Sequence, residues 1–89
     1  MAQVRLESPL AERIGGKGAV EVPAPTVESA LRGLTDRFPQ LVRLIWMEAG
    51  VVNPMLAVFL NDKLLEPQEM STTVEAEDKI DIIAAVAGG

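Results

Sequence analysis

A single amphipathic helix constrains the fold of this chain more than any other feature. Thr26 is a typical N-cap residue, and apolar side chains then recur three and four positions apart, at Val27, Ala30, Leu31, Leu34 and Phe38. Pro39 ends the pattern, because proline cannot continue a helix. The chain has 89 residues, the size of one domain, so this apolar stripe has to pack against another element of that same domain.

Short strand patterns lie on both sides of the helix. Alternating or strongly apolar runs predict strands at residues 3–7, 19–22, 55–60, 64–65 and 80–85. A second short helix is expected over residues 40–49, closed by Gly50. The order predicts an α+β fold in which one main helix packs on a small mixed sheet. The first two strands would pair antiparallel, and the first and last can lie side by side in parallel at the centre.

The missing residue types exclude most independent chemistry. There is no histidine and no cysteine, so the commonest general base, a thiolate nucleophile and a zinc–thiolate site are absent. We therefore expect no metal site, no bound cofactor and no enzyme activity of its own. No apolar run is long enough to span a membrane, and the first residues lack a signal-peptide pattern, which indicates a cytoplasmic protein.

Acidic residues gather in the last third of the chain. The net charge is −5, and between residues 61 and 81 only Lys63 and Lys79 oppose seven acids: Asp62, Glu66, Glu69, Glu75, Glu77, Asp78 and Asp81. This balance disfavours nucleic acid as a partner. It fits either a partner with a basic surface or a solvated acidic face that only aids solubility.

The chain stops on Gly88-Gly89, directly after Ala84-Ala85-Val86-Ala87. Glycine has no Cβ and a thin cross-section, so such an end can thread into a narrow site and present its carboxylate there. A frayed terminus is the alternative for a two-glycine end. We divide the chain into a domain at residues 1–87 and a flexible tail at residues 88–89.

Several features together resemble one family. They are the starting hairpin, the Pro-Thr-Val-Glu helix entry, the strand ending at Asn61, the Asp78-Lys79-Ile80 turn and the terminal Val86-Ala87-Gly88-Gly89. The combination resembles the ubiquitin-like sulfur-carrier family (ThiS/MoaD). That family includes the small subunit of molybdopterin synthase and the sulfur carriers of thiamin and cysteine synthesis. The resemblance implies a β-grasp fold.

The resemblance also implies a chemistry for Gly89. An E1-like adenylating enzyme would activate its carboxylate with ATP, sulfur would displace AMP to form a thiocarboxylate, and a partner synthase would accept the sulfur. Ala84-Ala85 departs from the family, whose members often carry proline there, and the length of residues 39–54 favours the molybdopterin or cysteine type. The alternatives are a small subunit held stably in molybdopterin synthase, a ubiquitin-like modifier conjugated through Gly89, and a plain binding module.

A docking surface is expected beside the tail. Alternation along the last strand puts Ile80 and Ile82 in the core and Ile83 on the other face, and the same reasoning places Phe59 outward. Phe59, Ile83 and Leu64 would then form an apolar patch that binds the partner together with Val86, Ala87 and Gly88 of the tail. The alternative is that residues 40–55 cover Phe59 and Ile83. Trp46 and Met47 are expected to contribute packing.

Overall fold

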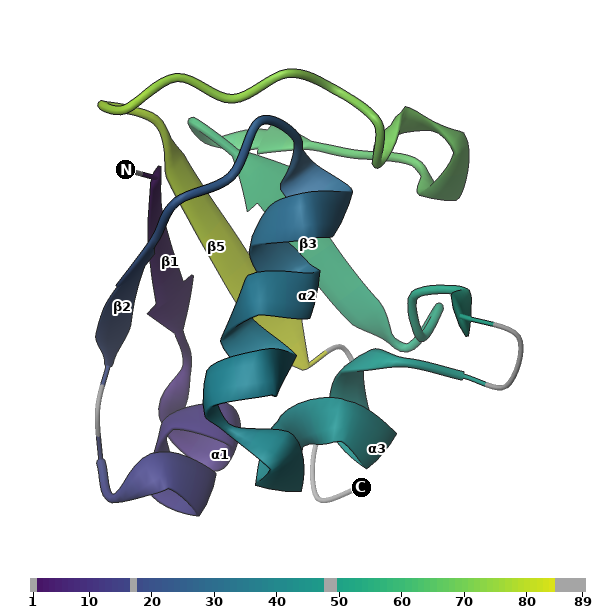
Figure 1. Cartoon of the computed structure of the whole chain (residues 1–89). Helices are drawn as coiled ribbons and strands as arrows, with labels where there is room; N and C mark the ends of the chain where they lie inside the picture. Colours follow the sequence, from purple (N-terminus) through teal and green to yellow (C-terminus); the bar gives the residue numbers. More distant parts are fainter. Residues whose placement is uncertain (1, 17, 48–49, 85–89) are drawn as a thin grey trace.

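Five strands and one main helix form the structure, as the sequence predicts. The computed structural model describes residues 2–16, 18–47 and 50–84. Its elements in chain order are β1 (Ala2–Leu6), α1 (Ser8–Ala11), η1 (Glu12–Ile14), β2 (Ala19–Val22), α2 (Val27–Arg37), η2 (Pro39–Leu41), α3 (Val42–Ile45), β3 (Leu56–Leu60), β4 (Lys63–Leu64), η4 (Pro67–Glu69) and β5 (Lys79–Ala84). Figure 1 shows α2 lying across one face of the sheet.

The sheet has the strand order β2-β1-β5-β3-β4. The first and last strands pair in parallel at its centre, with Val4 opposite Ile80 and Leu6 opposite Ile82. The other three pairings are antiparallel. Both predictions about the first strand, its antiparallel pairing with β2 and its parallel pairing with the last strand, are therefore confirmed.

Helix α2 begins where the sequence places its cap. The Ser29 backbone N–H donates to Thr26 Oγ1 at 3.1 Å, and the Thr26 backbone N–H donates to Ser29 Oγ at 3.0 Å. These reciprocal bonds satisfy backbone donors that a helix start otherwise leaves unpaired. The helix ends at Arg37. Close packing against β2 needs a small residue at Gly33, because a Cβ built there would lie 2.5 Å from Val22 Cγ1.

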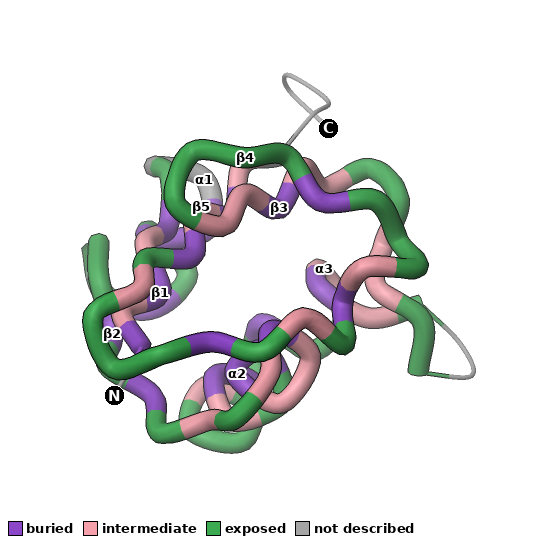
Figure 2. The backbone as a smooth tube through the Cα atoms, turned by 90° about the horizontal axis from the view of Figure 1, so that it is seen from above, coloured by how far each residue is buried: buried purple, intermediate pink, exposed green. Residues whose placement is uncertain are grey.

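The core lies between α2 and the sheet. Four alternating strand residues, Val4, Val58, Ile80 and Ile82, point towards the helix and are at most 1% exposed. Leu56 and Leu60 share their side of β3 and pack partly buried against this cluster. Figure 2 shows buried segments of the sheet and of α2 facing each other across the interior. Burial of this apolar area is the main favourable term in folding.

The predicted helix over residues 40–49 is only partly correct. Its helical part ends at Ile45, because Trp46 adopts an extended backbone and pairs with Val52. The Asn53 backbone N–H then donates to the Ile45 carbonyl at 2.8 Å, so the returning chain occupies the acceptor that a longer helix would have used. Gly50 has a φ of +73° and belongs to the turn between the paired segments, so it does not close the helix.

Trp46 packs as expected, but Met47 does not. Trp46 Nε1–H donates to Thr35 Oγ1 at 3.1 Å, and the Arg32 guanidinium lies 4.7 Å from the ring centroid. Such a cation over an indole ring is a favourable contact. Met47 is 52% exposed, so its expected packing is wrong.

Residues 2–16, 18–47 and 50–84 contain neither a membrane-spanning helix nor a cluster of potential metal ligands. No helix among them has the length and apolar character to cross a membrane. The same residues contain no group of three or more acidic, histidine or cysteine side chains arranged to hold a metal ion.

Candidate functional site

The face of the sheet opposite α2 carries a row of side chains across its three central strands. Arg5 of β1 and Phe59 of β3 both lie opposite Asp81 of β5 in the strand register. Residues directly opposite each other share a face of the sheet. The next residue of β5 on this face is Ile83, and all four side chains are partly buried.

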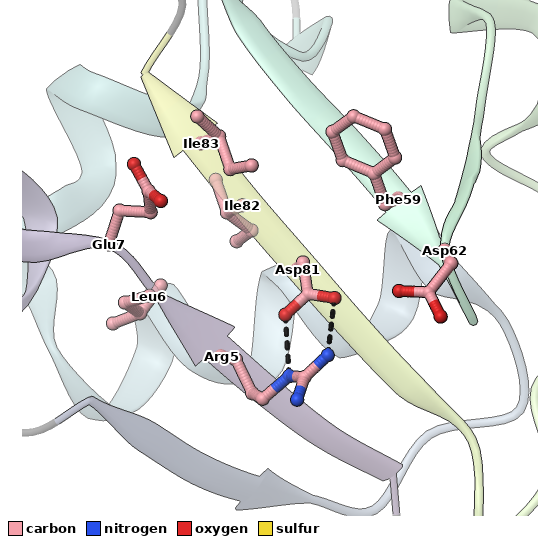
Figure 3. Close-up of a pocket in the computed structure, with 8 residues that line it drawn as sticks. All are labelled: Arg5, Leu6, Glu7, Phe59, Asp62, Asp81, Ile82 and Ile83. Carbon is pink, nitrogen blue, oxygen red and sulfur yellow. Dashed lines mark hydrogen bonds and ion pairs between the residues drawn. The ribbon is translucent and has the colours of Figure 1, made fainter.

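A hollow of about 270 Å³ lies on this face. Its lining comes from β1 and the residue after it, β3 and the turn after it, and β5: Arg5, Leu6, Glu7, Phe59, Asp62, Asp81, Ile82 and Ile83. Leu6 and Ile82 are buried residues of the inner face, and the other six are exposed or partly exposed. Figure 3 shows Phe59 and Ile83 together above the Arg5–Asp81 pair. The structure thus places both apolar residues on the outer face, as alternation predicts, and the described residues of the 40–55 segment (40–47 and 50–55) do not line the hollow.

Leu64 extends the apolar surface towards the sheet edge. It lies opposite Phe59 in the β3–β4 pair and is 51% exposed. It is not among the residues that line the hollow. A partner that covered the hollow and this edge strand together would bury all three residues of the expected patch.

An ion pair forms the polar centre of this face. Arg5 Nε donates to Asp81 Oδ1 at 2.5 Å, and Arg5 Nη2 donates to Asp81 Oδ2 at 2.7 Å. The hydrogen bond to Asp81 and the charge of that carboxylate raise the pKa of the Arg5 guanidinium, so it stays charged at all ordinary pH values. Sequence reasoning missed this pair, because its members are 76 residues apart. The signal that could have found it is their shared outward position on two strands expected to be parallel neighbours.

A polar clasp holds the start of β5 against the turn that follows β3. Asn61 Nδ2 donates to Asp78 Oδ1 at 2.9 Å, and the Lys79 backbone N–H donates to Asn61 Oδ1 at 2.9 Å. The Glu75 backbone N–H donates to Asp78 Oδ2 at 2.7 Å. This last bond, followed by the bond from Asn61, lowers the pKa of the Asp78 carboxyl, since both favour its charged form. The clasp gives a structural reason for the Asn61 and Asp78 positions that suggested the family.

The tail residues of the predicted site lie beyond the part of the chain that the structure describes. Ala84 is the last described residue, and it pairs with Leu56 at the beginning of β3. Val86, Ala87, Gly88 and Gly89, and with them the division at residues 87 and 88, lie outside the described residues. Ile83 immediately precedes Ala84, so the hollow lies next to the last described residue of β5.

Comparison with models of protein families shows which family the chain belongs to. The sequence matches the model of the ThiS family over residues 4–89. The chain belongs to the ThiS family. This match spans nearly the whole chain and runs through both terminal glycines, so the resemblance noted in the sequence is confirmed. Comparison with curated proteins finds no significant match.

Three solved structures share the fold of this chain. The chain is 23% identical to a structure from the BexX/CysO complex of Amycolatopsis orientalis, covering 100% of both chains with a TM-score of 0.86. It is 22% identical to the small archaeal modifier protein 1 of Methanosarcina acetivorans, covering 99% and 95% with a TM-score of 0.88. It is also 23% identical to a chain in the complex of molybdopterin-converting factor subunits 1 and 2 from Helicobacter pylori. That match covers 99% of this chain and 97% of the other, with a TM-score of 0.61. These likenesses confirm the ubiquitin-like β-grasp fold.

Proposed function

We propose that this ThiS-family chain is a sulfur carrier whose C-terminal carboxylate, on Gly89, is converted to a thiocarboxylate. The observation that carries the proposal is the family match, which continues through Gly88 and Gly89. The absence of histidine and cysteine supports it, because a carrier needs no general base or thiol of its own. The carrier would be no enzyme and would bind no cofactor, and ATP would be used by its partner in the cytoplasm.

The chemistry has two steps, both within an E1-like adenylating enzyme. A carboxylate oxygen of Gly89 attacks the α-phosphorus of ATP, and pyrophosphate leaves with the electron pair of the broken P–O bond. Hydrosulfide then attacks the carbonyl carbon of the acyl adenylate, AMP leaves, and loss of a proton gives the thiocarboxylate. A free carboxylate resists nucleophilic attack, whereas the adenylate carries a good leaving group. Gly88 and Gly89 lack side chains that would clash in a narrow site.

The outer face of the sheet supplies the docking surface in this proposal. Phe59 and Ile83 line the hollow near Ala84, the last described residue before the tail, and Leu64 continues the apolar surface. A partner seated there would hold the tail's attachment point in place while Val86, Ala87 and Gly88 lead Gly89 into its active site. A synthase of the molybdopterin or cysteine type would then accept the sulfur.

Likeness to an archaeal modifier favours a second candidate function. The fold matches the small archaeal modifier protein 1 with a TM-score of 0.88. A modifier would use the same adenylate of Gly89, but a lysine amine instead of hydrosulfide would displace AMP and form an isopeptide bond. A stable molybdopterin synthase subunit is the further alternative, and it predicts co-purification with a larger chain.

Deletion of Gly88 and Gly89 tests the proposal. We expect the shortened chain to accept no sulfur from ATP, activating enzyme and sulfide, with little change in melting temperature, because the described core residues, from Ala2 to Ile82, all precede the tail. Replacing both glycines with alanines keeps the chain length. This matched control shows whether loading depends on the thin cross-section of the glycines. Sulfur loading by the shortened chain, or lysine conjugates as the only product of the full chain, would contradict the carrier assignment.

A further inference from the structure

We propose that the hollow on the outer face receives a basic side chain, arginine or lysine, from the docking segment of the activating enzyme. This inference rests on the proposed function for the identity of that partner. It adds a chemical specificity to the docking surface, which the apolar residues alone do not define.

The hollow has an apolar part and a charged part that suit such a side chain. Figure 3 shows Phe59 and Ile83 at one end and the paired Arg5 and Asp81 at the other. Long basic side chains pack their methylene stems on apolar surface while the charged head remains among polar groups. An aromatic ring adds attraction for a cation that lies over its face.

The charge balance of the lining favours a cation. Among the described residues, three carboxylates, of Glu7, Asp62 and Asp81, line the hollow with a single guanidinium, that of Arg5, so three negative charges and one positive charge leave −2. Arg5 and Asp81 already satisfy each other through two hydrogen bonds. Glu7 and Asp62 are exposed, and their carboxylates make no hydrogen bond or ion pair within residues 2–16, 18–47 and 50–84, although the charge of Asp62 also attracts the Arg5 guanidinium from a longer distance.

The two remaining carboxylates lie on either side of β5. Figure 3 shows Glu7 beyond the end of β1 on one side and Asp62 after β3 on the other, with the Arg5–Asp81 pair between them. A cationic head group entering the hollow meets negative charge from both directions. An acidic partner group aimed at Arg5 would meet the same two carboxylates together with Asp81, and like charges brought together at an interface are strongly unfavourable.

The surroundings reinforce this choice at longer range. Residues 61–81 carry seven acids against two lysines, and the whole chain has a net charge of −5. A field of this sign raises the rate of encounter with a basic docking segment, and added salt weakens that effect. The hollow thus combines a shape for the side-chain stem, a local charge for its head and a field that guides its approach.

A charge-neutralising double variant tests the proposal in the loading reaction. Glu7→Gln with Asp62→Asn keeps the side-chain shapes, and asparagine tolerates the left-handed backbone of Asp62, whose φ is +72°. The matched control is Asp36→Lys, which changes the net charge by the same amount on the exposed side of α2, across the sheet from the hollow. With the adenylating enzyme of the same organism, we expect the KM for the double variant to rise about tenfold at low salt. The control should stay within about twofold of the unsubstituted chain.

A titration without the enzyme keeps the test independent of the sulfur chemistry. The probes are two blocked tripeptides, acetyl-Leu-Arg-Leu-amide and acetyl-Leu-Gln-Leu-amide, added to isotopically labelled protein and followed by NMR. We expect the arginine peptide to shift the amide signals of Arg5, Glu7, Asp62 and Ile83, and the glutamine peptide and the double variant to show no such shifts.

The results distinguish failure of the basic side-chain inference from failure of the proposed carrier function. Sulfur loading with an unchanged KM in the double variant, or equal shifts from both peptides, overturns the basic side-chain inference and leaves the carrier function intact. If the unsubstituted chain accepts no sulfur, the proposed function fails, and selective shifts from the arginine peptide still support a cation-accepting hollow.

Discussion

The two faces of the central strands carry opposite kinds of residue from the same stretch of sequence. On the inner face Val4, Ile80 and Ile82 are sealed between sheet and helix, with no exposed surface at all. On the outer face, one position along each strand, Arg5 and Asp81 form an ion pair and remain partly exposed. Successive residues of a strand point to opposite faces of the sheet. Alternate positions along each strand therefore either stabilise the fold or remain open to a partner.

The energetic difference between the faces is large. Burial of a valine or isoleucine side chain contributes about 1.5–3 kcal/mol of stability, and the inner face buries several. A partly exposed ion pair contributes little, because water and salt screen it and its side chains lose freedom. The outer face can therefore carry charged and apolar residues chosen for recognition with little effect on folding. Substitutions on each face should therefore affect different properties of the protein.

The largest effect is expected from Ile80→Ala on the inner face. The side chain is fully buried, so its loss should reduce the free energy of unfolding by about 2–5 kcal/mol through lost burial and a residual cavity. Chemical denaturation measures this, and Ile80→Val, with an expected loss of about 0.5–1.5 kcal/mol, is the graded control. At a temperature where Ile80→Ala is folded, its KM for sulfur loading should be normal. A near-neutral alanine variant would mean that the inner face does not support the fold as described.

Phe59→Thr should show the reverse behaviour. Threonine suits a strand, and it avoids the like-charge contact with Asp81 that an aspartate at this position would create. We expect the KM for loading to rise about tenfold, because an aromatic residue at the centre of an interface carries much of the binding energy. The unfolding free energy should fall by about 1 kcal/mol or less. Normal loading by Phe59→Thr and by Ile83→Thr would place the docking surface elsewhere.

Gly33→Ala tests how tightly the helix layer packs. Alanine favours a helix over glycine by about 1 kcal/mol, but its Cβ would lie 2.5 Å from the buried Val22 Cγ1. Overpacking of this kind costs about 1–3 kcal/mol, so the net result should be a loss of about 1 kcal/mol in unfolding free energy. Val22→Ala removes the clashing methyl, so the double variant should be more stable than the sum of the two single changes predicts. Simple additivity would contradict the close contact.

The smallest effect concerns the clasp at Asp78, outside both faces. Its pKa is lowered in the folded state, so its contribution to stability is present above the unfolded pKa of about 4 and is lost as the pH falls through the lower folded value. Asp78→Asn cannot titrate. Its melting temperature should therefore fall less than that of the unsubstituted chain when the pH is lowered from about 7 to about 3. Identical acid responses in the two proteins would remove Asp78 as a source of this pH dependence.

Local pattern was enough to predict most of the fold. The stripe of α2, its Thr26 cap and the alternation of β1 and β2 are signals carried within a few residues, and the structure bears each of them out. Alternation also assigned Ile80 and Ile82 to the core and Phe59 and Ile83 to the outer face. These predictions succeeded because the spacing of apolar residues along a helix or strand determines which of its faces is buried.

The missed features depend on contacts between distant residues. Residues 40–49 carry a helical apolar pattern, but pairing of Trp46 with Val52 ends the helix at Ile45. Periodicity cannot reveal a returning segment that competes for the same backbone groups. The Arg5–Asp81 pair requires the register of β1 against β5, which a single sequence does not contain. The acidic hollow was likewise visible in the sequence only as an excess of carboxylates.

The mass of the intact protein, purified without tags from its native cells, shows whether Gly89 carries sulfur. We expect a species heavier by the difference between sulfur and oxygen, with the added mass localised to Gly89 by fragmentation. The same species should accumulate when purified protein is incubated with ATP, the adenylating enzyme and sulfide. An unchanged mass under both conditions, with the enzyme shown to be active, would contradict the assignment of this chain as a sulfur carrier.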